Sequence, residues 1–264
     1  MIQGAIRALR RLTPPALRPR IRQALFDWLQ LEWPLPSGLR VRVGNYGEWV
    51  VYNEIFVSGE YDPALIMAFD RAAAAGRRPS VVDLGANTGF FTLRVRHEAR
   101  MRRMGVAVTA IEALPNMVER FRRRMSEQSP DESDVRLVQG LAGERTGTAL
   151  FYEDTAHVSA STCTPPAGEG SRRSAPLRLP YLDLSELLKR DDRIDLLKCD
   201  IEGSEERVIA TYPDVLAKVD VAVFEFHRNL CDVDRCQALL RQYGFTHHAT
   251  FRYDAVNFTY GVWR

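Results

Sequence analysis

The 264-residue sequence predicts an α/β fold in which helices cover both faces of a mostly parallel sheet. Three observations predict it. From residue 80 onward, short apolar runs alternate with helical patterns, and the first of these runs leads into a glycine-rich turn. The last two apolar runs lie too close together to enclose a helix, so we expect them to pair as an antiparallel hairpin.

The elements follow from the spacing of apolar residues. Runs of four to eight apolar residues predict strands, and apolar positions repeating every three or four residues predict the helices between them. The strands are expected at residues 80–84, 106–112, 135–141, 194–200 and 219–226, and the closing hairpin at 245–250 and 256–263. The helices are expected at residues 89–102, 115–127, 204–211 and 233–243.

The first 49 residues have a different pattern. Residues 2–12 and 16–31 have helical spacing and are separated by a Thr-Pro-Pro segment. Residues 1–40 carry seven arginines and two acids, whereas the whole chain has a net charge of only +2. We therefore expect a basic helical extension or flap over residues 1–49, and one larger domain over residues 50–264. Weak contact with a membrane surface or a partner would involve residues 1–40.

Composition excludes several classes of protein. The chain has no run of about 18 apolar residues, and arginines and prolines interrupt its start, so we expect a cytoplasmic protein, at most peripheral at a membrane. The four cysteines form no C-x-x-C pair, which argues against a disulfide framework and a zinc ribbon. The small net charge argues against a nucleic-acid partner. Residues 165–176 are rich in Gly, Pro and Ser and predict an exposed loop.

The glycine-rich turn is the first candidate binding motif. Gly85 and Gly89 would allow a sharp turn and close approach of a ligand, and the helix that follows would present N–H groups to a carboxylate. A dinucleotide site would need a glycine where Asn87 stands. Asp83 would repel a pyrophosphate, but it could accept a hydrogen bond from a ligand ammonium group or a bridging water.

The next two strands extend this site. Glu112 ends the second strand, 23 residues after Gly89, where a carboxylate can accept hydrogen bonds from ribose hydroxyls. Leu141 and Ala142 follow the third strand among small residues, where an adenine ring could bind, although an ordinary turn explains them equally well.

A second set of polar residues lies in the fourth and fifth strands. With a period of two, Lys198, Asp200 and Glu202 would share one strand face. His227 and Glu225 would share a face of the next strand, and the carboxyl ends of parallel strands converge at one edge of the sheet. Glu205 and Glu206 could instead serve the start of a helix.

These motifs together resemble the FkbM family of methyltransferases. The resemblance is carried by residues 56–63, 81–93, 110–121, 193–209 and 223–227. It implies a Rossmann-like class I methyltransferase fold with a seven-stranded sheet, S-adenosylmethionine as cofactor, and a small-molecule or glycan acceptor. It also implies that Glu60 and Tyr61 lie beside the cofactor pocket.

The expected reaction is O-methylation of a hydroxyl, with His227 as preferred base, Asp200 as its orienting group or the alternative base, and Lys198 and Glu202 as further catalytic residues. The preferred mechanism uses no metal. In an alternative mechanism, Asp200, Glu202 and His227 hold a divalent ion. N-methylation, carboxyl methylation and a non-enzymatic binding module are the remaining alternatives.

Overall fold

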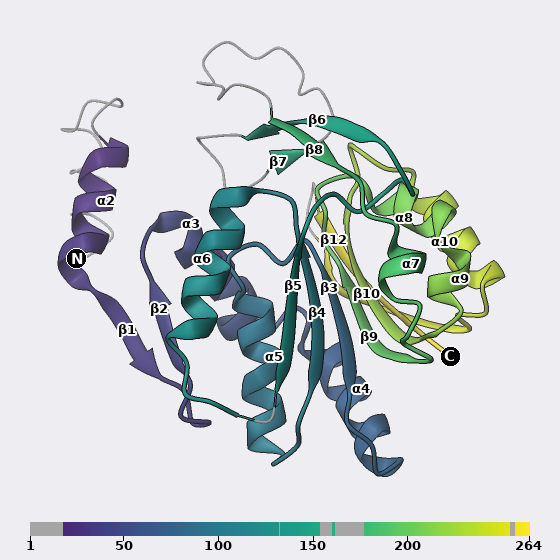
Figure 1. The fold of residues 1–264 in the computed structure, drawn as a ribbon, viewed down its shortest axis with the longest axis horizontal. Helices are drawn as coiled ribbons and strands as arrows, with labels where there is room; N and C mark the ends of the chain where they lie inside the picture. Colours follow the sequence, from purple (N-terminus) through teal and green to yellow (C-terminus); the bar gives the residue numbers. More distant parts are fainter. Residues whose placement is uncertain (1–17, 132, 154–159, 162–176, 254–256) are drawn as a thin grey trace.

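The computed structural model describes residues 18–131, 133–153, 160–161, 177–253 and 257–264. At its centre is a seven-stranded sheet with the order β11-β12-β10-β9-β3-β4-β5 (Figure 1). Its strands are β3 (Ser80–Leu84), β4 (Ala107–Glu112), β5 (Asp134–Gln139), β9 (Ile194–Cys199), β10 (Val219–His227), β11 (His247–Tyr253) and β12 (Asn257–Trp263). β12 runs opposite to the other six strands of this sheet and pairs antiparallel with β10 and β11. The predicted fold class is therefore confirmed.

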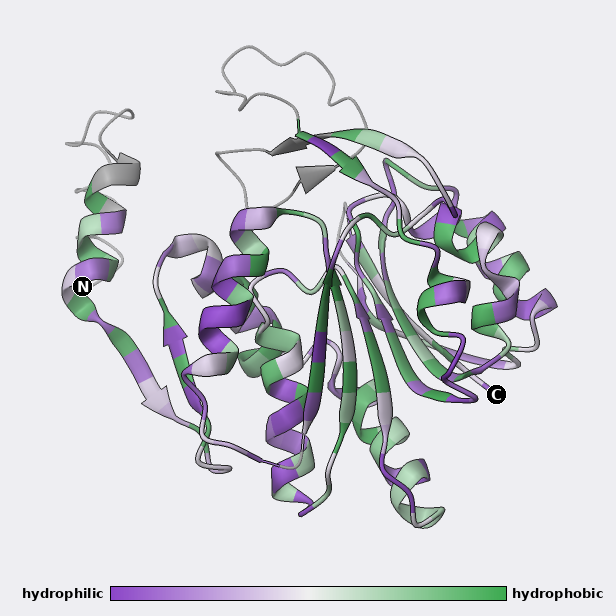
Figure 2. Cartoon of the chain, viewed as in Figure 1, coloured by the Kyte–Doolittle hydropathy of each residue, from purple (hydrophilic) through white to green (hydrophobic). Residues whose placement is uncertain are grey.

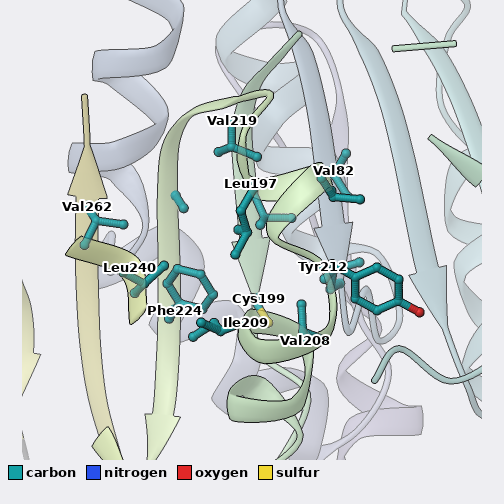
Figure 3. Close-up of a cluster of buried hydrophobic side chains, with 14 of the residues drawn as sticks. Val82, Leu197, Cys199, Val208, Ile209, Tyr212, Val219, Phe224, Leu240 and Val262 are labelled. Atoms are coloured by element: carbon teal, nitrogen blue, oxygen red, sulfur yellow. The ribbon is translucent and has the colours of Figure 1, made fainter. Parts of the chain in front are cut away.

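Helices cover both faces of this sheet, because its central strands are apolar on both sides. All six residues of β9 are buried. On one face, Val82, Leu197 and Phe224 pack with α8 (Glu205–Thr211), α9 (Pro213–Leu216) and α10 (Val233–Gln242). Figure 3 shows these strand residues together with Val208 and Ile209 of α8 and Leu240 of α10. On the other face, Val81 and Leu196 pack with α4 (Asp62–Ala74) and α5 (Phe90–Met101). Figure 2 shows the apolar residues concentrated in these strands and the polar residues on the outer helix surfaces.

The remaining elements surround this core. Before β3 lie α2 (Arg18–Leu29), a hairpin of β1 (Leu31–Pro34) and β2 (Arg40–Val43), α3 (Tyr46–Tyr52) and a π-helical turn, η2 (Asn53–Val57). After β4 comes α6 (Pro115–Ser126), and α7 (Leu184–Leu187) precedes β9. A second sheet has the order β7-β6-β8, formed by β6 (Thr148–Glu153), β7 (Ala160–Ser161) and β8 (Leu177–Pro180).

Several sequence expectations need correction. The first hairpin and the second sheet were not predicted, because short strands in polar segments lack a distinct apolar period. The strand expected at 194–200 ends at Cys199, and Glu202 has a φ of 55°. Asp200 and Glu202 therefore lie in the loop after β9, where the side-chain alternation of a strand does not apply. The strand expected at 135–141 ends at Gln139. The expected helix at 2–12 and the expected loop at 165–176 lie outside the described residues.

The N-terminal helix α2 exposes apolar side chains. Ile21, Leu25 and Trp28 are exposed, whereas Phe26 packs against the core. Within the described residues, no helix has the length and apolar character needed to cross a bilayer. Cys199, Cys231 and Cys236 are free thiols, and Cys199 and Cys236 are buried.

Candidate active site

The glycine-rich turn lies between β3 and α5, against the loop that follows β9. Gly85, Asn87 and Gly89 all have positive φ angles, which glycine adopts without strain. A Cβ atom on Gly85 would lie 1.8 Å from the carbonyl oxygen of Asp200. The absence of a side chain at Gly85 therefore brings the turn into contact with Asp200.

Glu112 links the second strand to this turn. Its carboxylate accepts hydrogen bonds from the backbone N–H groups of Asn87 and Leu114, both at 2.8 Å. The side chain is buried, and burial raises the pKa of Glu112, while these backbone donors oppose the rise.

A pocket opens beside Glu112. Among the predicted cofactor residues, it is lined by Gly85, Asn87, Glu112, Leu141 and Ala142. Apolar walls come from Ile111, Leu114 and Met117. Asp200 and Glu202 line the same pocket. The structure thus brings most of the predicted cofactor residues together with two of the predicted catalytic residues.

Asp83 lies near the end of β3, as expected, but its side chain does not face this pocket. It is fully buried, does not line this pocket, and accepts a hydrogen bond from the Thr92 hydroxyl at 3.1 Å. Its other carboxylate oxygen lies 3.4 Å from Nζ of Lys198. The geometry gives no support to a direct contact between Asp83 and a ligand, because the side chain points to Lys198 instead. Gly89 also lies outside the pocket lining, at the start of α5.

Lys198, in β9, contacts the glycine turn and the carboxylates of Asp83 and Asp200. It is almost fully buried, and its ammonium group donates to the carbonyl oxygen of Gly85 at 2.8 Å. It also lies 3.4 Å from Oδ2 of Asp200. Burial alone would lower the pKa of Lys198, but the carboxylates of Asp200 and Asp83 raise it. Lys198 therefore joins the glycine turn to two carboxylates as a permanent cation.

His227, at the end of β10, lies between two glutamates. Its Nε2 is 3.0 Å from Oε2 of Glu202, and its Nδ1 is 3.2 Å from Oε1 of Glu205. Burial favours the neutral ring, but both glutamates favour the imidazolium and raise the pKa of His227 to about 12. The sequence interpretation missed the contact with Glu205, although the second glutamate of the E-G-x-E segment was its signal.

The Tyr61 hydroxyl links a further carboxyl group, that of Glu225, to Asp200. Its hydroxyl lies 2.8 Å from Oε2 of Glu225 and 3.2 Å from Oδ2 of Asp200. Burial and the nearby charge of Asp200 raise the pKa of Glu225 to about 8. Tyr61 thus contacts Asp200, which lines the pocket, but is not part of the pocket lining itself.

Glu60 faces another cavity. It forms an ion pair with Arg252 and lines a groove of about 800 Å³ between α3, η2 and β11, together with Trp49, Glu54 and Phe251. The sequence did not indicate this groove, because its walls come from segments about 200 residues apart.

Comparison with known proteins supports the family suggested by these motifs. A family model described as methyltransferase FkbM domain matches residues 83–247. The AMB antimetabolite synthetase AmbE of Pseudomonas aeruginosa is 29% identical over 270 residues, which cover 87% of this chain and 12% of that protein. The chain therefore spans a small part of that relative's length.

A solved structure has a similar fold. It is the crystal structure of methyltransferase FkbM from Methylobacillus flagellatus KT, with a TM-score of 0.50 and 14% sequence identity. The match covers 70% of this chain and 44% of that chain.

Proposed function

The chain belongs to the FkbM family of methyltransferases, and we propose that it transfers the methyl group of S-adenosylmethionine to a hydroxyl oxygen of a small molecule or glycan. One observation carries the proposal. The pocket formed by the glycine turn and Glu112 is also lined by Asp200 and Glu202, so the cofactor residues and the acidic residues face one space. S-Adenosylmethionine supplies an electrophilic methyl group there.

The residues of the pocket fit this cofactor. The Glu112 carboxylate accepts hydrogen bonds from the backbone N–H groups of Asn87 and Leu114, and the N–H of Ala113 also acts on it. A carboxylate has about four acceptor positions, and the remaining capacity suits the ribose hydroxyls. Ile111, Met117 and Leu141 provide an apolar wall for the adenine ring. These roles make Glu112 the main determinant of cofactor affinity.

The acidic surroundings favour a hydroxyl as the methyl acceptor. An alcohol must lose its proton as the new bond forms, so it needs a proton acceptor within hydrogen-bond reach. Asp200 and Glu202, which line the pocket, would repel a carboxylate substrate. An amine acceptor is the main alternative, and the experiment below separates the two.

We assign proton removal to Asp200. The sequence favours His227 as the base, but both of its ring nitrogens already face glutamate oxygens. The Asp200 carboxylate lines the pocket and is partly exposed to it. In this arrangement Lys198 and Tyr61 orient Asp200, and Glu202 holds His227.

The proposal is tested with paired acceptors and an isosteric variant. Hydroxyl compounds and their amine analogues are incubated with S-adenosylmethionine carrying a labelled methyl group, and product formation is measured. Transfer to amines alone would overturn the assignment of O-methylation. Asp200→Asn should reduce kcat at least about 100-fold. Its affinity for S-adenosylhomocysteine, measured by calorimetry, should stay within a few-fold of the wild type. Asp192→Asn, an exposed change nearby in sequence, is the control.

A further inference from the structure

Three residues at the carboxyl ends of β9 and β10 hold possible metal-ligand atoms close to one another. Asp200, Glu202 and His227 each offer one ligand atom, and these atoms lie within 4.8 Å of one another. Asp200 and Glu202 come from the loop after β9, whereas His227 ends β10. Their convergence depends on the adjacent, parallel pairing of β9 and β10.

Glu205 gives the histidine the environment of a metal ligand. The side chain of Glu205 is fully buried, and its Oε1 accepts hydrogen bonds from the backbone N–H groups of Ile201 and Gly203. The same oxygen lies 3.2 Å from Nδ1 of His227. A metal-bound histidine commonly donates its second N–H to a carboxylate, which fixes the ring and makes the other nitrogen a better ligand. Here that other nitrogen, Nε2, faces Glu202, and a bound cation would take the place of the Nε2 proton, which is released to solvent.

Charge balance independently favours a bound cation. The carboxylates of Asp83, Asp200, Glu202 and Glu205 lie in one buried or half-buried region. Within the described part of the chain, Lys198 contacts Asp83 and Asp200, and His227, when protonated, contacts Glu202 and Glu205. In addition, Oε2 of Glu205 is buried without a hydrogen-bond partner among the described residues. An excess of buried negative charge is costly unless a cation compensates it.

We propose that Asp200, Glu202 and Nε2 of His227 bind one divalent cation, with Glu205 as the residue that positions the imidazole. Two carboxylates and one imidazole suit a cation that accepts both oxygen and nitrogen ligands, and we therefore expect Mn²⁺ to bind more tightly than Mg²⁺. The three protein ligands leave coordination positions open.

The catalytic role of the cation rests on the proposed function. A cation at this position could bind the acceptor hydroxyl and lower its pKa, which would assist proton removal by the Asp200 oxygen that does not bind the cation. Cation binding itself does not depend on that role, so it is tested without methyl transfer.

The test uses the full chain after treatment with a chelator, titrated with Mn²⁺ and followed by electron paramagnetic resonance. We expect saturable binding of one Mn²⁺ per chain, and a spin-echo modulation from one imidazole nitrogen. Glu202→Gln and His227→Ala should each weaken binding at least about tenfold, and the His227 variant should lose the nitrogen modulation.

Glu205→Gln tests the positioning role. It should weaken Mn²⁺ binding by about 10-fold to 100-fold and keep the nitrogen modulation, because His227 is still present. Glu206→Gln is the matched control, since Glu206 contacts Arg235 and the backbone of Asp232 instead of His227. Thermal melting verifies that each variant is folded.

Two results would overturn the proposal. One is the lack of saturable Mn²⁺ binding to the wild type. The other is Mn²⁺ binding that persists unchanged in a folded Glu202→Gln variant. This substitution should disturb the fold least, because the Glu202 side chain is partly exposed in the wild type. Calorimetry with S-adenosylhomocysteine on the same samples reports separately on the proposed methyltransferase function.

Discussion

The Glu112 carboxylate accepts a hydrogen bond from the backbone N–H of Asn87 at 2.8 Å, which joins the end of β4 to the glycine turn after β3. The two residues are 25 positions apart, and the parallel pairing of β3 with β4 brings them together. Asn87 has a φ of 49°, an uncommon conformation for a residue other than glycine. Glu112 therefore both stabilises the turn and lines the pocket.

Replacement of Glu112 by Gln should weaken cofactor binding. The change keeps the size of the side chain and removes its charge, so hydrogen bonds worth about 2 kcal/mol should be lost. We expect the Kd for S-adenosylhomocysteine to rise about 30-fold in calorimetry. Glu119→Gln, an exposed change on α6, is the control. Equal affinities of the two variants would refute the role of Glu112.

Replacement of Gly85 by Ala should disrupt the contact between the turn and Asp200. The new Cβ atom would lie 1.8 Å from a backbone oxygen, in addition to the strain of a φ of 76°. Gly76→Ala separates these effects, because Gly76 has a φ of 63° and no atom within 4 Å of the added Cβ. We expect Gly76→Ala to cost about 1 to 2 kcal/mol in free energy of unfolding. Gly85→Ala should cost more than about 4 kcal/mol, and similar losses would contradict the clash.

Sequence patterns predicted the central sheet because its inner strands are apolar on both faces and its helices have regular spacing. The β9 run from Ile194 to Cys199 is such a case, since every residue is buried. The hairpin of β1 and β2 gave no such signal, because each strand has only four residues and buries few of them, namely Val41 and Val43 of β2. Short exposed strands depend on their tertiary partners.

The candidate site was predicted less completely than the fold. The glycine turn and Glu112 could be placed because each follows an apolar strand. The contacts between Tyr61 and Asp200, and between Glu205 and His227, join segments 139 and 22 residues apart. Side-chain direction at such loop positions is set by tertiary packing, which local spacing does not encode. Asp83 shows this, since its position was predicted and its partner, Lys198, was not.

Arg124 should be a strong determinant of stability, because it ties the N-terminal segment to the glycine turn. Its buried guanidinium donates to the carbonyl oxygens of Thr88 and Arg42 and to the Glu48 carboxylate, at 2.7 to 2.8 Å. Lysine cannot reproduce this fork of donors. We expect Arg124→Lys to reduce the free energy of unfolding by about 3 kcal/mol in urea denaturation.

The neighbouring residue provides the control for Arg124. Arg123 is exposed and pairs with Glu127 one turn along α6, so Arg123→Lys should change stability by less than about 0.5 kcal/mol. A comparable loss in both variants would mean that the fork of Arg124 contributes little.

Asp131 should make stability depend on pH. Its carboxylate accepts hydrogen bonds from Arg96 and Arg100 and from the backbone N–H of Ser133. Burial alone would raise the pKa of Asp131, but the Ser133 N–H and the Arg96 guanidinium outweigh it and lower the pKa below its usual value. A lowered pKa in the folded state contributes stability above the unfolded pKa of about 3.9. That contribution is lost as pH falls through the folded pKa.

The variant Asp131→Asn tests this linkage. At pH 7 it should be less stable than the wild type by about 2 kcal/mol, because the charged hydrogen bonds are lost. The difference should be the same at pH 5.5 and then shrink as pH falls below about 4, because Asp131 of the unfolded chain takes up a proton there while the folded carboxylate stays charged to a lower pH. Urea denaturation midpoints at pH 7, 5.5 and 3 measure it. Asp134→Asn, at an exposed position three residues along, should show a small difference at every pH. A gap between Asp131→Asn and wild type that stays constant down to pH 3 would exclude the charged form of Asp131 as its source.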